Sequence, residues 1–160
     1  MIYRFRIILD VKEDVLRDIE IESSSSLEDF HHAIAQSFGF GGKEIASFYY
    51  SNKNWEQGDE IPLIEMSDQQ TSMGGKTLDS IFNNEHNLIY VYDFLLLWTF
   101  LIELIEIVEN NLNSLYPNLI FAQGEVPEEA PVKSFVSKEN LINNDDTLVQ
   151  DSNIDEDQYC

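Results

Sequence analysis

The chain begins with an alternation of apolar and polar residues that is typical of a half-buried β-strand. Over residues 3–9, one side carries Tyr3, Phe5, Ile7 and Leu9, and the other carries Arg4, Arg6 and Ile8. A side-chain period of two places these sets on opposite faces of a strand. After a short polar connection, Ile19 and Ile21 alternate with acids in residues 15–22. The two segments therefore predict a β-hairpin.

The next segment has the spacing of an amphipathic helix. Ser25 and Ser26 each precede an acid by three residues, which is the spacing of a capping box at a helix N-terminus. The apolar stripe that follows consists of Leu27, Phe30, His31, Ile34 and Phe38. Gly39 comes directly after the stripe and is a residue type that favours a helix end. We therefore expect a helix over residues 27–38, packed on a sheet through Phe30, Ile34 and Phe38.

Weaker patterns predict further elements along the chain. Residues 45–51 fit a strand, residues 61–64 a short edge segment and residues 77–82 one helical turn. Residues 88–94 are apolar on both sides, which favours a central strand. Residues 95–108 are ambiguous, because acids recur there at helical spacing while β-branched residues favour a strand.

Composition divides the chain into two parts. Residues 1–124 hold 20 acids and 7 bases, a net charge of −13, whereas residues 125–160 hold ten acids and two lysines, a net charge of −8. The second part has few large apolar residues, so it has little apolar surface with which to offset the loss of backbone entropy on ordering. We expect an α+β domain over residues 1–124 and an acidic, mobile tail over residues 125–160. The competing expectation is that Leu148 and Val149 dock on the sheet.

The formal net charge of the whole chain is −21, from 30 acids and nine Lys and Arg residues. Such a charge repels phosphate backbones and anionic lipids, so nucleic-acid and membrane-surface binding are disfavoured.

The single cysteine, Cys160, excludes an internal disulfide and a thiolate metal cage. The N-terminus lacks the apolar core of a signal peptide, and the apolar run at residues 94–102 is shorter than the ~20 residues that cross a bilayer. We expect a cytoplasmic protein.

The sequence offers few candidates for a metal, catalytic or phosphate-binding site. His31 and His32 are adjacent, and adjacent helical side chains point about 100° apart, so we expect no metal site there. Asp93 lies in an apolar segment, where its carboxylate must find hydrogen-bond donors; we favour the interpretation that it caps a turn. The glycines of residues 39–42 follow a helix instead of opening one and lack a GK[ST] ending, so they do not predict a phosphate loop. We expect no cofactor.

Several short segments together resemble one known family. The matching segments are residues 15–21 (a hairpin motif), residues 27–34 (a helix motif of the form L..LH..I), Tyr90-Val-Tyr-Asp-Phe94 followed by Trp98 (a YxYDFGDxW signature), and Tyr116-Pro117 with Gly124 (a closing YP…G stretch). In this order and spacing, residues 2–130 resemble the plasmid pRiA ORF-3-like family of bacterial and archaeal proteins. Leu95 and Leu96 stand where the family pattern has Gly-Asp.

The resemblance implies how the sheet continues. It implies that residues 97–108 form a strand returning beside residues 88–94, so that the ambiguous segment is a strand. The implied fold is α+β, with a mixed β-sheet and one main helix packed across it, similar to β-grasp and ubiquitin-like folds. The resemblance implies an uncharacterised bacterial protein and supplies no activity.

Three functional hypotheses follow. The favoured one is a non-enzymatic protein-interaction module, because no complete catalytic motif occurs and an exposed sheet edge or aromatic-rimmed groove can bind another protein. Its candidate binding surface consists of Tyr92, Asp93, Trp98 and Tyr116, and its acidic charge favours basic protein partners. The first alternative is a small hydrolase or transferase in which Asp93 is the base beside His31. The second is a regulator linked to DNA or mobile elements, which the thinly spread basic residues disfavour.

Overall fold

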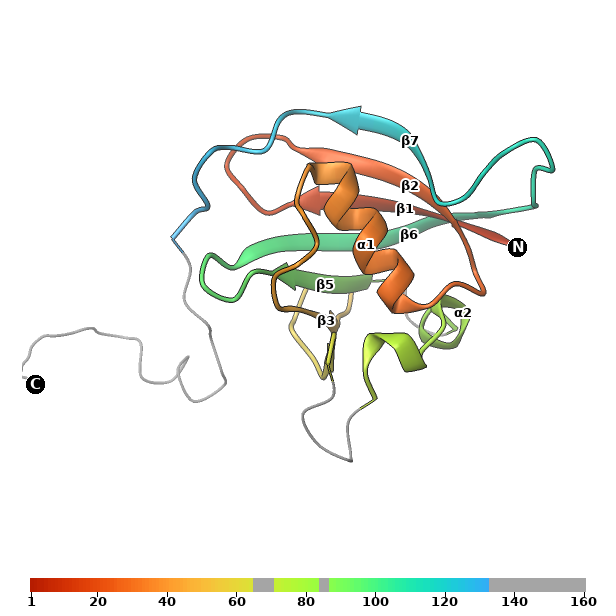
Figure 1. The fold of residues 1–160 in the computed structure, drawn as a ribbon, viewed down its shortest axis with the longest axis horizontal. Helices are drawn as coiled ribbons and strands as arrows, with labels where there is room; N and C mark the ends of the chain where they lie inside the picture. Colours follow the sequence, from red (N-terminus) through yellow and green to blue (C-terminus); the bar gives the residue numbers. More distant parts are fainter. Residues whose placement is uncertain (65–70, 84–86, 133–160) are drawn as a thin grey trace, which may run out of the picture.

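A computed structural model of the chain shows a seven-stranded sheet with one long helix lying across one face (Figure 1). The structure describes residues 1–64, 71–83 and 87–132. The elements follow the chain as β1 (Ile2–Leu9), β2 (Leu16–Glu22), α1 (Leu27–Phe38), β3 (Ala46–Tyr50), β4 (Glu60–Pro62), the 3₁₀ turn η1 (Met73–Gly75), α2 (Leu78–Ile81), β5 (Asn87–Tyr92), β6 (Trp98–Val108) and β7 (Asn118–Gln123). In these ranges, no helix is both long and apolar enough to span a membrane.

The strand order is β4-β3-β5-β6-β1-β2-β7, and each neighbouring pair of these strands is antiparallel. The α+β class is therefore confirmed, but the expected mixed sheet is wrong for the strands described. The reason lies in the connections: β1–β2, β3–β4 and β5–β6 are hairpins, which require antiparallel neighbours. The narrower likeness to ubiquitin-like folds stays a prediction.

The N-terminal hairpin forms with the faces that its alternation predicts. Phe5 pairs with Ile19, and both are buried on the side of the sheet that α1 covers. On the other face, Arg6 Nη2 lies 2.8 Å from Asp18 Oδ2, and Arg4 binds Glu20 in the same way at 2.6 Å. The hairpin thus packs apolar residues under the helix and arranges ion pairs on the open face.

Helix α1 begins and ends where its capping signals predict. The Asp29 backbone N–H donates to Ser26 Oγ at 3.1 Å, and the Ser26 backbone N–H donates to Asp29 Oδ2 at 3.3 Å, which completes a capping box. Gly39 ends the helix with φ 85°, a left-handed conformation that costs glycine little. Both ends of the helix are thus fixed by local sequence.

The core lies between α1 and the sheet, and it is rich in aromatic rings. Phe30 of α1 is fully buried, with its ring centroid 4.6 Å from that of Phe5 and 5.8 Å from that of Phe48. Strand β5 is buried along its whole length, as expected for a central strand. On the opposite face, a smaller apolar cluster forms around Tyr49, Ile89, Val91 and Leu97.

The ambiguous segment is a strand, as the resemblance implies. Strand β6 lies between β1 and β5 and carries Glu103 and Glu106 on its solvent side, where Glu106 binds Arg4. The helical spacing of the acids is therefore outweighed by pairing with two neighbouring strands. Such tertiary context commonly overrides local preference.

Strand β7 is an element that the sequence analysis does not predict. It pairs with β2 and forms one edge of the sheet. Beyond it, Val126 and Ala130 pack partly against the core. The domain boundary after residue 124 stays a prediction, and most of the expected acidic tail, residues 133–160, lies outside the described residues.

Candidate functional site: an open sheet edge beside α1

Asp93 organises the turn between β5 and β6. Its Oδ1 accepts hydrogen bonds from the backbone N–H groups of Leu95 at 3.0 Å and Leu96 at 3.2 Å. Its own backbone has φ 68°, and its N–H donates to the Ile45 carbonyl at 2.9 Å. The carboxylate therefore has the turn-capping role that the sequence analysis favours for it.

His31 has a different partner. Its side chain is fully buried, and Nδ1 lies 2.5 Å from Tyr90 Oη. Burial, together with the neighbouring His32, lowers the pKa of His31 to about 4, so the ring is neutral at pH 7. The Asp93 carboxylate binds backbone N–H groups while His31 binds a tyrosine, so the structure does not assemble them as an acid–base pair.

The four residues expected to form a binding surface do not lie together on the surface. Tyr92 and Trp98 are 3% and 5% exposed and belong to the core under α1, which corrects their assignment. The Tyr92 hydroxyl accepts the backbone N–H groups of residues 42–44, so it fixes the loop after α1. Tyr116 precedes β7, whose first residues pair at the end of β2 remote from the Asp93 turn (Figure 1).

The feature that stands out instead is the outer edge of β7, which pairs with no further strand among the described residues. Leu119, Ile120 and Phe121 are half-exposed there, and no residue of β7 is charged. The opposite edge strand, β4, has only three residues and includes Pro62, which cannot donate a backbone hydrogen bond. Of the two edges, β7 is thus the one chemically open to another strand. The signal in the sequence is the apolar, β-branched and aromatic run at 119–121, between Pro117 and Gly124.

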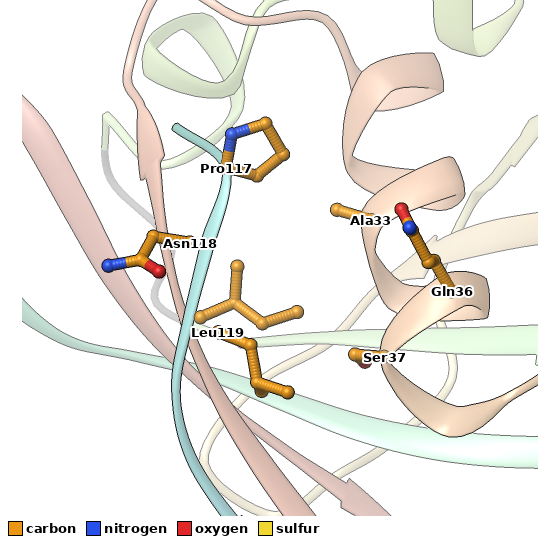
Figure 2. Close-up of a pocket in the computed structure, with 7 residues that line it drawn as sticks. Ala33, Gln36, Ser37, Pro117, Asn118 and Leu119 are labelled. Atoms are coloured by element: carbon orange, nitrogen blue, oxygen red, sulfur yellow. The ribbon is translucent and has the colours of Figure 1, made fainter. Parts of the chain in front are cut away.

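A pocket of about 380 Å³ lies between this edge and α1 (Figure 2). Residues Ala33, Gln36 and Ser37 line it from α1, and Pro117 and Leu119 line it from the β7 side. Figure 2 shows the Asn118 side chain pointing away from the helix, so the polar lining comes chiefly from α1. The pocket therefore has both apolar and polar side chains in its lining.

Arg17 holds β7 and α1 in place. Its buried guanidinium donates to three backbone carbonyls, those of Ser37 at 2.9 Å, Leu16 at 2.8 Å and Gln123 at 3.0 Å. It also lies 4.8 Å from the centroid of the Phe38 ring. Helix α1 has no basic residue in its last turn, so Arg17 supplies a cation to its negative end. Burial lowers the pKa of Arg17 from its ordinary value.

No group of three or more His, Cys, Asp or Glu side chains among the described residues is arranged to hold a metal ion. The acids nearest the edge are instead engaged in ion pairs: Asp18 with Arg6 and Glu20 with Arg4. The chemistry of the site is therefore that of backbone hydrogen bonding and apolar contact.

These observations define a class: an α+β protein in which one main helix covers one face of an antiparallel sheet and, among the described strands, an uncharged strand forms one edge. The chain belongs to the plasmid pRiA4b ORF-3-like protein family, whose model matches residues 1–145. This match confirms the family resemblance found in the sequence.

A solved structure is also similar in fold. It is the crystal structure of a protein of unknown function from Methanosarcina mazei Go1, with 21% identity and a TM-score of 0.69, covering 79% of this chain and 72% of that chain. No match to the chain is found among curated proteins. The comparisons therefore establish the family and the fold.

Proposed function

We propose that the protein is a non-enzymatic interaction module that binds an extended segment of a partner protein along the outer edge of β7. The observation that carries this proposal is the uncharged, half-exposed edge strand, held in place by Arg17. A peptide that adds a strand to such an edge gains main-chain hydrogen bonds, and its alternate side chains enter neighbouring pockets. A cytoplasmic location belongs to the same proposal.

The pocket beside β7 supplies the selectivity of this edge. Leu119 pairs with Ile19 on the side of the sheet that faces α1, and both line the pocket. A strand added to β7 directs every second side chain to this side. The side chain that enters the pocket contacts these apolar residues and reaches the Gln36 amide with a polar end.

Charge favours a basic partner. The net charge of −21 attracts positively charged segments, and the three described arginines are already engaged within the protein. Electrostatic complementarity of this kind mainly accelerates association and excludes acidic competitors. We therefore expect the bound segment to be extended, rich in β-branched residues and flanked by Lys or Arg.

The test uses the full chain and a display library of random short peptides. We expect the selected peptides to have the pattern above and to shift the backbone amide resonances of residues 118–123 and the Gln36 side-chain amide. Phe121→Lys places a charge on the edge and repels a basic partner, and it should weaken binding of the selected peptides about tenfold or more.

The matched control is Leu112→Lys, which makes the same change in charge at an exposed leucine outside β7. It should bind the selected peptides as the wild type does. Equal binding by Phe121→Lys, or resonance shifts confined to another surface, would overturn the proposal.

A further inference from the structure

The turn between β5 and β6 presents leucine side chains to solvent on a fixed backbone. Leu95 is 94% exposed and Leu96 is also exposed. Both backbone N–H groups are held by Asp93 Oδ1, and the Leu97 N–H donates to the Asp93 carbonyl at 2.6 Å. Exposing two large apolar side chains to water on an ordered turn costs free energy. An exposed apolar patch commonly marks an interaction site.

An apolar cleft of about 300 Å³ lies directly beside this turn, at the β4 edge of the sheet. Its apolar lining comes from Ile45, Ala46, Pro62, Leu63, Ile64 and Phe94. The cleft and the turn are continuous, because Phe94 belongs to both and the Asp93 N–H binds the Ile45 carbonyl. One end of the molecule therefore carries a protruding apolar group next to an apolar hollow.

We infer that this surface binds a second copy of the chain, with Leu95 and Leu96 of each copy seated in the cleft of the other. A two-fold interface requires one patch to be complementary to itself, and a projection beside a hollow meets that requirement. The sizes agree, since an apolar cavity of about 150 Å³ accommodates one benzene-sized group and this cleft has room for two leucine side chains.

The charges at the cleft support a second copy over a strongly basic partner. The charged residues that line the cleft carry both signs, Lys43 against Glu44 and Glu60, and all three are exposed. When a patch meets itself across a two-fold axis, opposite charges of the two copies can face each other. The rest of each copy is strongly acidic, so screening of the −21 charges by salt should strengthen the dimer.

Sedimentation of the full chain at low and high NaCl tests the inference. We expect a monomer–dimer equilibrium that shifts toward the dimer between about 50 mM and about 500 mM NaCl. A basic peptide bound to the same cleft would instead dissociate over this range. In a dimer of mixed isotope labels, nuclear Overhauser contacts should join Leu95 methyl groups to Ile64 methyl groups across the interface.

Two substitutions probe the leucines directly. Leu95→Ala should raise the dimer dissociation constant about a hundredfold, because each dimer loses two buried leucines. Leu95→Asp should leave the chain monomeric at both salt concentrations. The matched control is Leu112→Asp, at a leucine that is 97% exposed outside this surface, and it should dimerise as the wild type does. Dispersed amide spectra confirm that each variant is folded.

Three results would overturn the inference: a monomer at all concentrations and salt levels, a dimer that survives Leu95→Asp, or equal loss of the dimer in the control. The inference is independent of the function proposed for β7. Phe121→Lys should leave dimerisation unchanged, and peptide binding at β7 should persist in Leu95→Asp.

Discussion

At the scale of single residues, His31 shows how burial decides a histidine's chemistry. Its ring lies in the core, where Tyr90 is its hydrogen-bond partner, and Nε2 has none among the described residues. Burial also raises the pKa of the Tyr90 hydroxyl above its ordinary value. A neutral histidine bonded to a protonated tyrosine suits a packed interior, and charging this ring would bury an uncompensated cation.

We expect His31 to make the protein less stable in mild acid. The imidazole has its ordinary pKa of 6.5 when unfolded and about 4 when folded. Below pH 6.5 the unfolded chain therefore takes up a proton that the folded chain does not. The free energy of unfolding should fall by on the order of 3 kcal/mol between these two pH values, and this group causes no further loss below pH 4.

Urea denaturation at a series of pH values measures this dependence. His31→Gln should remove the part of the pH dependence of the unfolding free energy that is due to this group. His32→Gln, at an exposed neighbour that is the smaller cause of the shift, should retain most of it. If the unfolding free energy of His31→Gln and that of the wild type change equally between pH 4 and 6.5, the His31 ring is not held neutral in the folded protein.

At the scale of elements, the position of β7 depends on one side chain from β2. Arg17 joins the last turn of α1 to the end of β7 through backbone carbonyls that are 86 residues apart, at Ser37 and Gln123. Local sequence around β7 does not specify this contact. The edge strand is therefore attached to the core by hydrogen bonds from a buried cation as well as by its pairing with β2.

Arg17→Met should destabilise the protein by about 2–3 kcal/mol, because charge-assisted hydrogen bonds to carbonyls are lost. Amide exchange should accelerate most in residues 118–123 and least in β5. Lys12→Met replaces an exposed cation that takes no part in these hydrogen bonds and is the control, with an expected change of at most about 0.5 kcal/mol. Equal costs for the two variants, or uniform acceleration of exchange, would show that Arg17 has no special role at this edge.

At the scale of the whole molecule, stability depends on the aromatic core under α1. Phe30 contacts rings from both halves of the sheet, Phe5 on β1 and Phe48 on β3. These strands are separated in the sheet by β6 and β5, so Phe30 ties the two halves together through the helix. The core is thus one continuous cluster that joins both halves of the sheet.

Phe30→Ala should lower the free energy of unfolding by about 3–5 kcal/mol, which is a large fraction of the ~5–15 kcal/mol of a small domain. Thermal melting followed by circular dichroism measures the effect. Leu112→Ala, at an exposed leucine, should melt as the wild type does. Wild-type melting of Phe30→Ala would contradict the packing of α1 on the sheet.

The sequence by itself determined the elements whose signals are local. The alternation of residues 3–9, the Ser26–Asp29 capping box and Gly39 each specify a short segment through its own side-chain period or backbone preference. The turn-capping role of Asp93 could likewise be inferred from its immediate neighbours.

Only the tertiary structure decided the features that depend on distant partners. Whether residues 98–108 form a helix or a strand depends on pairing with β1, which lies about a hundred residues earlier in the chain. Strand β7 forms an edge of the sheet because it pairs with β2. Burial of Tyr92 and Trp98 follows from the position of α1 over the sheet. These outcomes depend on contacts between segments far apart in the chain, and a local pattern of side chains does not specify which distant segments will meet.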